Sequence, residues 1–197
     1  ISSTSSWQPG TFVLAATPVT DQPVLSITAI AGALATTSTT DAHANDDATP
    51  DTVTLTAADR VTVSLNIASP DSDGSEHLIR VVIDNVPLGV TVTGAEFIGG
   101  GRWLLVYEGA EALPVNAAGG IGLPVEFVVS PQANGVDQGI TLTVQTQDRG
   151  NDPAAETLVL SDSVTWHLNT TFPADDGEIP ATILDWTYNN TSATEDT

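Results

Sequence analysis

The chain of 197 residues contains no cysteine, no methionine and no lysine, and only 5% of its residues are aromatic. Without cysteine it has neither a disulfide framework nor a thiol for catalysis or soft-metal binding. If such a chain works outside the cell, its stability must come from core burial or from bound metal. The shortage of aromatic residues also disfavours a large sugar-binding surface, because glycan sites usually expose aromatic side chains beside polar groups.

Long apolar runs are absent as well. No stretch approaches the roughly 20 consecutive apolar residues of a membrane span. The first six residues, Ile1-Ser2-Ser3-Thr4-Ser5-Ser6, lack the basic and apolar regions of a signal peptide. We therefore expect no direct membrane insertion, and we expect the chain to be an internal piece of a longer protein whose secretion signal lies elsewhere.

Positive charge is scarce. The four basic residues are all arginines, against 25 acidic residues, and the formal net charge is −21. Such a surface repels nucleic acid and anionic lipid headgroups, so neither is an expected partner, whereas divalent cations are favoured. An alternative is that the acids only keep a halophilic or marine protein soluble. Solvated acids should scatter along the chain, whereas many of these cluster in loop sequences.

The sequence gives no support for catalysis. His43, His77 and His167 are isolated, and there is no nucleophile elbow, zinc-protease motif or phosphate-binding loop. His77 follows Glu76, but neighbours on a strand point to opposite faces, so the two do not form an acid/base pair. We expect the protein not to be an enzyme.

Apolar and polar residues alternate as they do in β-strands. In residues 61–67 and 140–146 every second side chain is apolar, which gives a strand one buried and one wet face. Further predicted strands are residues 24–29, 53–56, 78–83, 90–93, 103–107, 125–129, 158–160 and 164–168. Short strands at this spacing predict an antiparallel, immunoglobulin-like β-sandwich. At most one helical turn is expected, near residues 56–59 or 110–113.

Composition also predicts the domain boundaries. Two prolines in residues 17–23 indicate a stiff, extended joint, and residues 172–180 break the strand pattern. The main domain is predicted to span residues 20–170. Residues 1–19 and 171–197 are assigned to adjoining units, or to a split second unit in which residues 11–15 contact residues 183–188.

An acidic loop sequence, Asp71-Ser72-Asp73-Gly74-Ser75-Glu76, separates two predicted strands. Carboxylates two and three residues apart around a flexible glycine can converge on one hard cation, and calcium takes roughly six to eight oxygen ligands. A second acidic loop runs from Asp148 to Asp152. Ordinary solvated turns are the alternative interpretation of both loops.

Several motifs occur in a recognisable order. They are Thr17-Pro18-Val19-Thr20-Asp21-Gln22-Pro23, the acidic loop, Val86-Pro87-Leu88-Gly89-Val90, Gly100-Gly101-Arg102-Trp103 and the closing Ala193-Thr194-Glu195-Asp196-Thr197. This series resembles the immunoglobulin-like and cadherin-like tandem domains of large calcium-dependent RTX adhesins, which Gram-negative bacteria secrete by a type I system. The resemblance covers roughly residues 17–168 and the closing motif.

The resemblance implies an extracellular, bacterial cell-surface protein for cell adhesion and biofilm formation. It further implies Ca²⁺ as the bound ion, neighbouring domains of the same chain as partners, and a monomeric unit. The implied calcium ligands are Asp21, Asp71, Asp73, Glu76, Asp148 and Asp152, with Gly74 allowing the turn. Residues 30–51 are longer than in the compact family repeats. Two functions therefore stay open: a calcium-stiffened extender domain, or a module that binds a glycan, a peptide or a partner domain.

Overall fold

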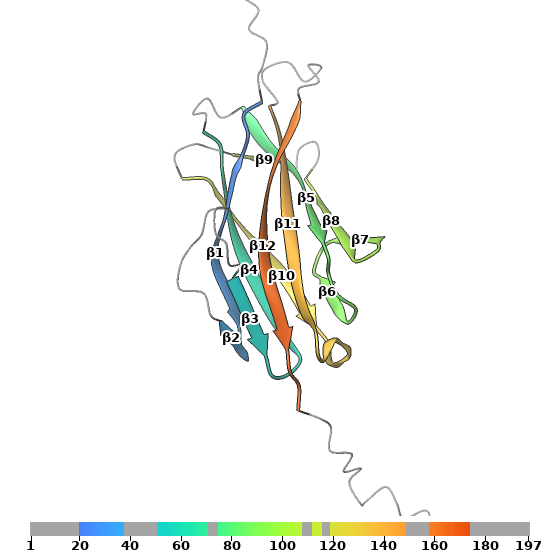
Figure 1. The fold of residues 1–197 in the computed structure, drawn as a ribbon. Helices are drawn as coiled ribbons and strands as arrows, with labels where there is room; N and C mark the ends of the chain where they lie inside the picture. Colours follow the sequence, from blue (N-terminus) through green and yellow to red (C-terminus); the bar gives the residue numbers. More distant parts are fainter. Residues whose placement is uncertain are drawn as a thin grey trace, which may run out of the picture.

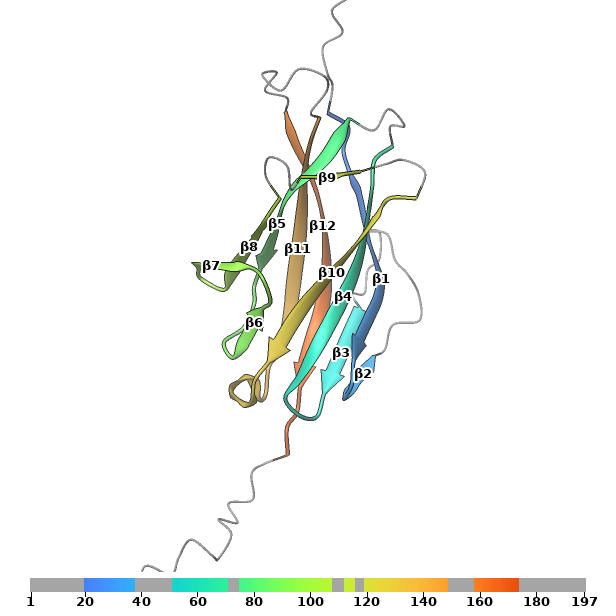
Figure 2. The same cartoon turned by 180° about the vertical axis from the view of Figure 1, so that it is seen from behind.

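The computed structural model describes residues 20–37, 51–70, 75–107, 112–115, 119–148 and 158–173, which form a sandwich of two β-sheets (Figures 1 and 2). The smaller sheet has four strands in the order β1 (Val24–Gly32), β4 (Asp59–Ala68), β10 (Ile121–Val129) and β6 (Val90–Val92). The larger sheet has eight. Their order is β2 (Ala35–Thr37), β3 (Asp51–Leu55), β12 (Val159–Thr170), β11 (Asp137–Asp148), β5 (Glu76–Asp84), β8 (Arg102–Val106) and β7 (Glu96–Gly99), with β9 (Leu113–Pro114) paired to β5.

The predicted immunoglobulin-like β-sandwich is confirmed. Its pairs are antiparallel except β3 with β12, which run parallel. The two predicted strands at 158–160 and 164–168 form one strand, β12. Residues 56–58 form a bend between β3 and β4 rather than a helical turn, and Leu113 lies in β9. The short helix of the described region is instead the 3-10 helix η2 (Pro131–Ala133).

The core lies between the two sheets and follows from the alternation. On β4 the apolar residues Val61, Val63, Leu65 and Ile67 are fully buried, while the residues between them are partly exposed. At the centre the rings of Phe127 and Trp166 meet edge to face, with centroids 5.1 Å apart. None of the described residues lies in a helix long and apolar enough to cross a membrane.

The described chain runs through the sandwich from end to end (Figure 1). We call the end at Thr20 the proximal end and the end at Thr170 the distal end. At the proximal end the Leu25 amide donates to the Asp162 carboxylate (2.9 Å), which ties the start of β1 to β12. At the distal end the Thr170 amide donates to the Val136 carbonyl (2.8 Å). Both ends of the described domain are therefore bonded into its sheets.

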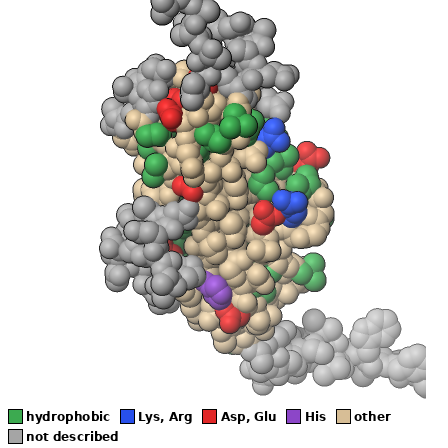
Figure 3. Space-filling model, turned by 45° about the horizontal axis from the view of Figure 1, so that its top comes forward, with side chains coloured by type: hydrophobic (Ala, Val, Ile, Leu, Met, Phe, Trp, Pro, Cys, Tyr) green, Lys and Arg blue, Asp and Glu red, His purple; other side chains and the backbone are tan. Residues whose placement is uncertain are grey.

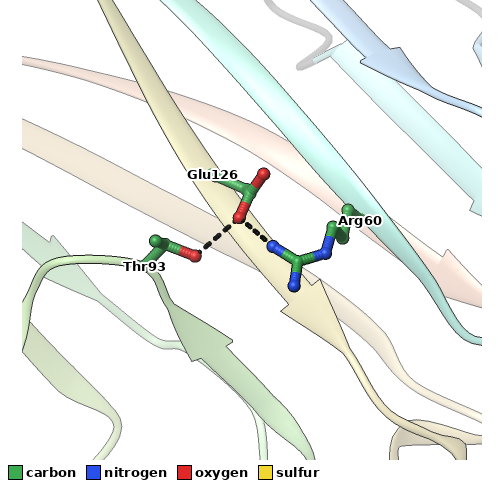
Figure 4. Close-up of polar contacts among 3 residues, drawn as sticks. All are labelled: Arg60, Thr93 and Glu126. Carbon is green, nitrogen blue, oxygen red and sulfur yellow. Dashed lines mark hydrogen bonds and ion pairs between the residues drawn. The ribbon is translucent and has the colours of Figure 1, made fainter.

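A polar cluster on the outer face of the smaller sheet holds the three-residue strand β6 in place (Figure 4). Glu126 on β10 accepts a hydrogen bond from the Thr93 hydroxyl (2.8 Å), just after β6, and forms an ion pair with Arg60 on β4. The pKa of Glu126 is lowered, first by the Thr93 hydrogen bond and further by the Arg60 guanidinium.

The central aromatic pair yields a prediction for stability. Trp166→Ala should lower the free energy of unfolding by about 3–5 kcal/mol, because it leaves a large cavity beside Phe127. Trp166→Phe is the matched control. It keeps a ring against Phe127 and removes a buried indole N–H that no described residue accepts, so it should cost much less. Urea denaturation measures both, and equal losses would show that ring packing is not what Trp166 supplies.

The Glu126 cluster yields a prediction for pH. A carboxyl whose pKa is lowered by folding stabilises the protein above its ordinary value of 4.5, and this contribution disappears as the pH falls through the lowered value. The stability difference between wild type and Glu126→Gln should therefore be present near neutral pH and close on acidification. Urea midpoints across that range measure it, and Thr93→Val should reduce the same difference. A difference independent of pH would contradict a role for the carboxylate charge.

Candidate functional site

The inner faces of the sheets change from apolar to polar at the proximal end. On β11 the buried series Ile140, Leu142, Val144 continues in the same phase with Thr146 and Asp148. Five buried polar residues occur at this end, and we call them the proximal polar layer: Thr20 (8% exposed), Ser69 (4%), Glu76 (1%), Thr146 (1%) and Asp148 (3%). The layer lies where an ordinary sandwich core would end in apolar side chains.

Two carboxylates form the centre of this layer. Glu76 is the first residue of β5, Asp148 is the last residue of β11, and the antiparallel register places them directly opposite one another. Such cross-strand partners share one face of the sheet, with Cβ atoms about 4.5–5.5 Å apart. Both are buried, so both carboxylates lie on the inner face.

A β-bulge sets this orientation. Gln145 pairs with Arg80 and Thr146 pairs with Leu78, which leaves Ile79 as an extra residue on β5. The extra residue shifts the phase of β5 by one, so that Leu78 and Glu76 stay on the same face as Val81. The Val115 amide donates to the Glu76 carbonyl (2.8 Å) and fixes the start of the strand.

Burying two like charges side by side is costly. An ionised carboxylate loses its hydration on burial, and a second carboxylate on the same face adds repulsion. A divalent cation between them offsets both costs, because carboxylate oxygens are the ligands that hard cations prefer. The arrangement is therefore suited to binding a hard cation.

The segment that leads into β1 contacts the backbone of Asp148. The Asp148 amide donates to the Thr20 hydroxyl oxygen at 3.3 Å, a contact between residues 128 positions apart. Asp21, predicted from the sequence as a ligand at the joint, follows Thr20 and is partly exposed. The fold therefore brings the joint to the same end as Glu76 and Asp148.

Thr146 is a further oxygen that the acidic-loop motifs did not identify. Its hydroxyl is buried, it lies two residues before Asp148 on the same face of β11, and no described residue hydrogen-bonds to it. The sequence signal was the period of two, which continues from Val144 into Thr146 and Asp148. A buried hydroxyl beside two carboxylates is a seventh candidate ligand.

Three of the predicted ligands, Asp71, Asp73 and Asp152, lie outside the described residues. Within the described ranges, no group of three or more histidine, aspartate or glutamate side chains is placed to hold a metal ion. Glu76 and Asp148 are the two predicted ligands that the structure brings together, with Asp21 next to their contact residue Thr20. The split-unit contact between residues 11–15 and 183–188 also lies outside the described residues.

Comparison with known proteins gives little further information. No protein-family model matches the sequence, and no curated protein matches it. Among solved structures, the fold is similar to AggA, the major subunit of aggregative adherence fimbriae type I from Escherichia coli, with 11% identity and a TM-score of 0.33. The match covers 81% of this chain and 100% of that chain. Similarity this low supports no statement about function.

The contact between the joint and the layer gives a testable expectation. Thr20→Val should lower the free energy of unfolding by about 0.5–1.5 kcal/mol, because the Asp148 amide loses its hydroxyl acceptor. Thr20→Ser keeps the acceptor and is the matched control. Urea denaturation in the presence of a chelator measures both without interference from metal. Equal stability of Thr20→Val and Thr20→Ser would contradict the contact.

Proposed function

We propose that the chain is a calcium-stiffened structural domain of a large bacterial cell-surface adhesin. The observation that carries this proposal is the buried, in-register pair Glu76 and Asp148 at the proximal end, where the Asp148 amide also donates to Thr20. A surface domain without disulfides needs another source of rigidity, and a cation at this end supplies it.

The residues present fit calcium. The proximal polar layer offers only oxygen atoms, with neither the thiolates nor the imidazoles that favour transition metals. Covalent reach limits how far the other predicted ligands lie from it. Asp73 is three residues from Glu76 in the sequence, and Asp152 is four residues from Asp148. With Asp21 and Thr146 nearby, a shell of six to eight oxygens is attainable.

Stiffening follows from where the ligands belong. Asp21 is part of the joint, whereas Glu76 and Asp148 belong to the larger sheet, so an ion shared between them fixes the joint to the domain. Binding is coupled to this ordered geometry and stabilises it by mass action. When calcium is removed, the neighbouring carboxylates repel one another and the joint loosens.

The end-to-end course of the chain supports an extender role. Thr20 and Thr170 lie at opposite ends of the sandwich, and the chain is hydrogen-bonded to the domain near both of them. The partners proposed for such a unit are the neighbouring domains of the same chain outside the cell, with the unit itself monomeric.

The alternative is a module that binds a glycan, a peptide or a partner domain. It is favoured by an aromatic pair, the exposed Phe97 and the partly buried Trp103, which lies on β7 and β8 rather than in the proximal layer.

Thermal melting with calcium and with EDTA tests the proposal. Calcium at about 100 times its dissociation constant should stabilise the fold by about 2.7 kcal/mol, or roughly 5–10 °C in Tm. Glu76→Gln and Asp148→Asn should lose most of this rise. In EDTA both variants should melt higher than wild type, because each removes one of two repelling charges while nearly keeping its shape.

Glu96→Gln is the matched control, since it removes one exposed carboxylate from β7, away from the layer. It should keep the full calcium response. A wild-type Tm indifferent to calcium would overturn the proposal, and so would equal loss of response in Glu96→Gln and Glu76→Gln, which would indicate general screening of charge.

A further inference from the structure

The larger sheet extends beyond the smaller one and leaves part of its inner face uncovered. Trp103 on β8 pairs with Ile83, whose side chain is fully buried, and also with Phe97 on β7. Cross-strand partners share a face, so Phe97 and Trp103 lie on the inward side of the sheet. Their ring centroids are 5.2 Å apart, yet Phe97 is 56% exposed. Figure 3 shows hydrophobic side chains among basic and acidic ones on the side where Figure 1 places β7 and β8.

This aromatic pair lines a groove of about 610 Å³. Its opposite wall is β6 with the turn before it, at whose tip Leu88 is 89% exposed. The turn after β7 is anchored, because the Val86 amide donates to the Gly101 carbonyl (2.8 Å) and a Cβ on Gly101 (φ +74°) would meet the Val86 carbonyl oxygen at 2.8 Å. The groove is therefore pre-formed and within the size range of ligand sites.

The lining determines which ligand chemistry fits. It contains no ionisable side chain, and its polar side chains are those of Thr91, Ser130 and Gln132. The Ser130 hydroxyl is already bonded to the Gly89 carbonyl (2.8 Å). Few groups therefore remain to bind the many hydroxyls of a sugar. An apolar side chain, which needs no partner, fits this lining better.

The strands that border the groove favour a polypeptide as the occupant. In the described part of the chain, β6 and β7 are the last strands of their sheets on this side. An edge strand can pair with an extended segment, whose alternate side chains then point to one face. Asp84 and Glu126 form ion pairs with Arg102 and Arg60, while Glu96 precedes Phe97 on β7 and lies exposed on the opposite face of the sheet. Basic residues on the face of the segment turned away from the groove suit Glu96 and the net charge of −21, and that net charge disfavours a second copy of this chain.

We propose that this groove binds an extended peptide segment of another protein, anchored by an apolar side chain between Leu88 and the Phe97–Trp103 pair and flanked by basic residues. The site is separate from the proximal polar layer, so it operates with or without calcium. It gives the domain a lateral contact in addition to its end-to-end connections.

Titration of the full chain with synthetic peptides tests this site. The probes are Ac-Thr-Lys-Val-Thr-X-Lys-Thr-NH2 with X as Leu, Phe or Asp, so that the lysines of the extended peptide point to the opposite face from X. A Leu peptide whose lysines are replaced by glutamates is added. The Leu and Phe peptides should bind at least about tenfold more tightly than the Asp peptide, because they bury an apolar side chain. The glutamate-flanked peptide should bind more weakly than its lysine counterpart, and EDTA should change neither result.

Variants assign the binding to the groove. Phe97→Ala should weaken binding of the Leu peptide about tenfold, since it removes part of the aromatic wall. Leu34→Ala, at a residue 53% exposed in the β1–β2 turn, should leave it unchanged. If Phe97→Ala lowers the melting temperature of the protein, Leu88→Ser gives the same test at an exposed position. Equal binding of all peptides, or a Phe97→Ala variant that binds like wild type, would overturn the proposal. So would binding of a neutral oligosaccharide, lost in Phe97→Ala, without binding of any peptide.

Discussion

Two buried carboxylates held opposite one another by strand register are the constraint on which the proximal end depends. Glu76 and Asp148 are placed there by the pairing of β5 with β11 and by the bulge at Ile79. The pairing that buries the apolar residues of these strands also buries the two acids. Burial of the core and burial of the two acids therefore depend on the same pairing of β5 with β11. A cation that offsets the charge of the acids would also stabilise that pairing.

The same end receives the joint. Thr20 contacts the Asp148 amide, and Leu25 is bonded to Asp162 on β12, so the first described residues are fixed to the larger sheet. At the far end, Thr170 is bonded to Val136. A domain fixed in this way suits the axial role proposed for it. The partly exposed aromatic pair on β7 and β8 lies away from this axis, so the proposed axial and lateral roles do not compete for the same residues.

Local pattern in the sequence predicted most of the fold. Alternation identified the long strands, since each has one buried face, and the acidic loops pointed to Glu76 and Asp148. Alternation did not identify β2, β7 and β9, which have two to four residues and too few side chains for a period to appear. It also did not reveal that Glu76 faces Asp148, because that depends on pairing between segments about 70 residues apart and on a one-residue bulge. Part of the inner face near Phe97 is uncovered because the larger sheet is wider than the smaller one, and only the assembled fold determines these widths.

The most direct measurement of the central claim is a crystal structure grown in calcium, with anomalous scattering recorded to identify the ion. The account predicts an anomalous peak about 2.3–2.6 Å from carboxylate oxygens of both Glu76 and Asp148. A structure in which the two carboxylates share a proton or face only water, with no ion between them at saturating calcium, would contradict it.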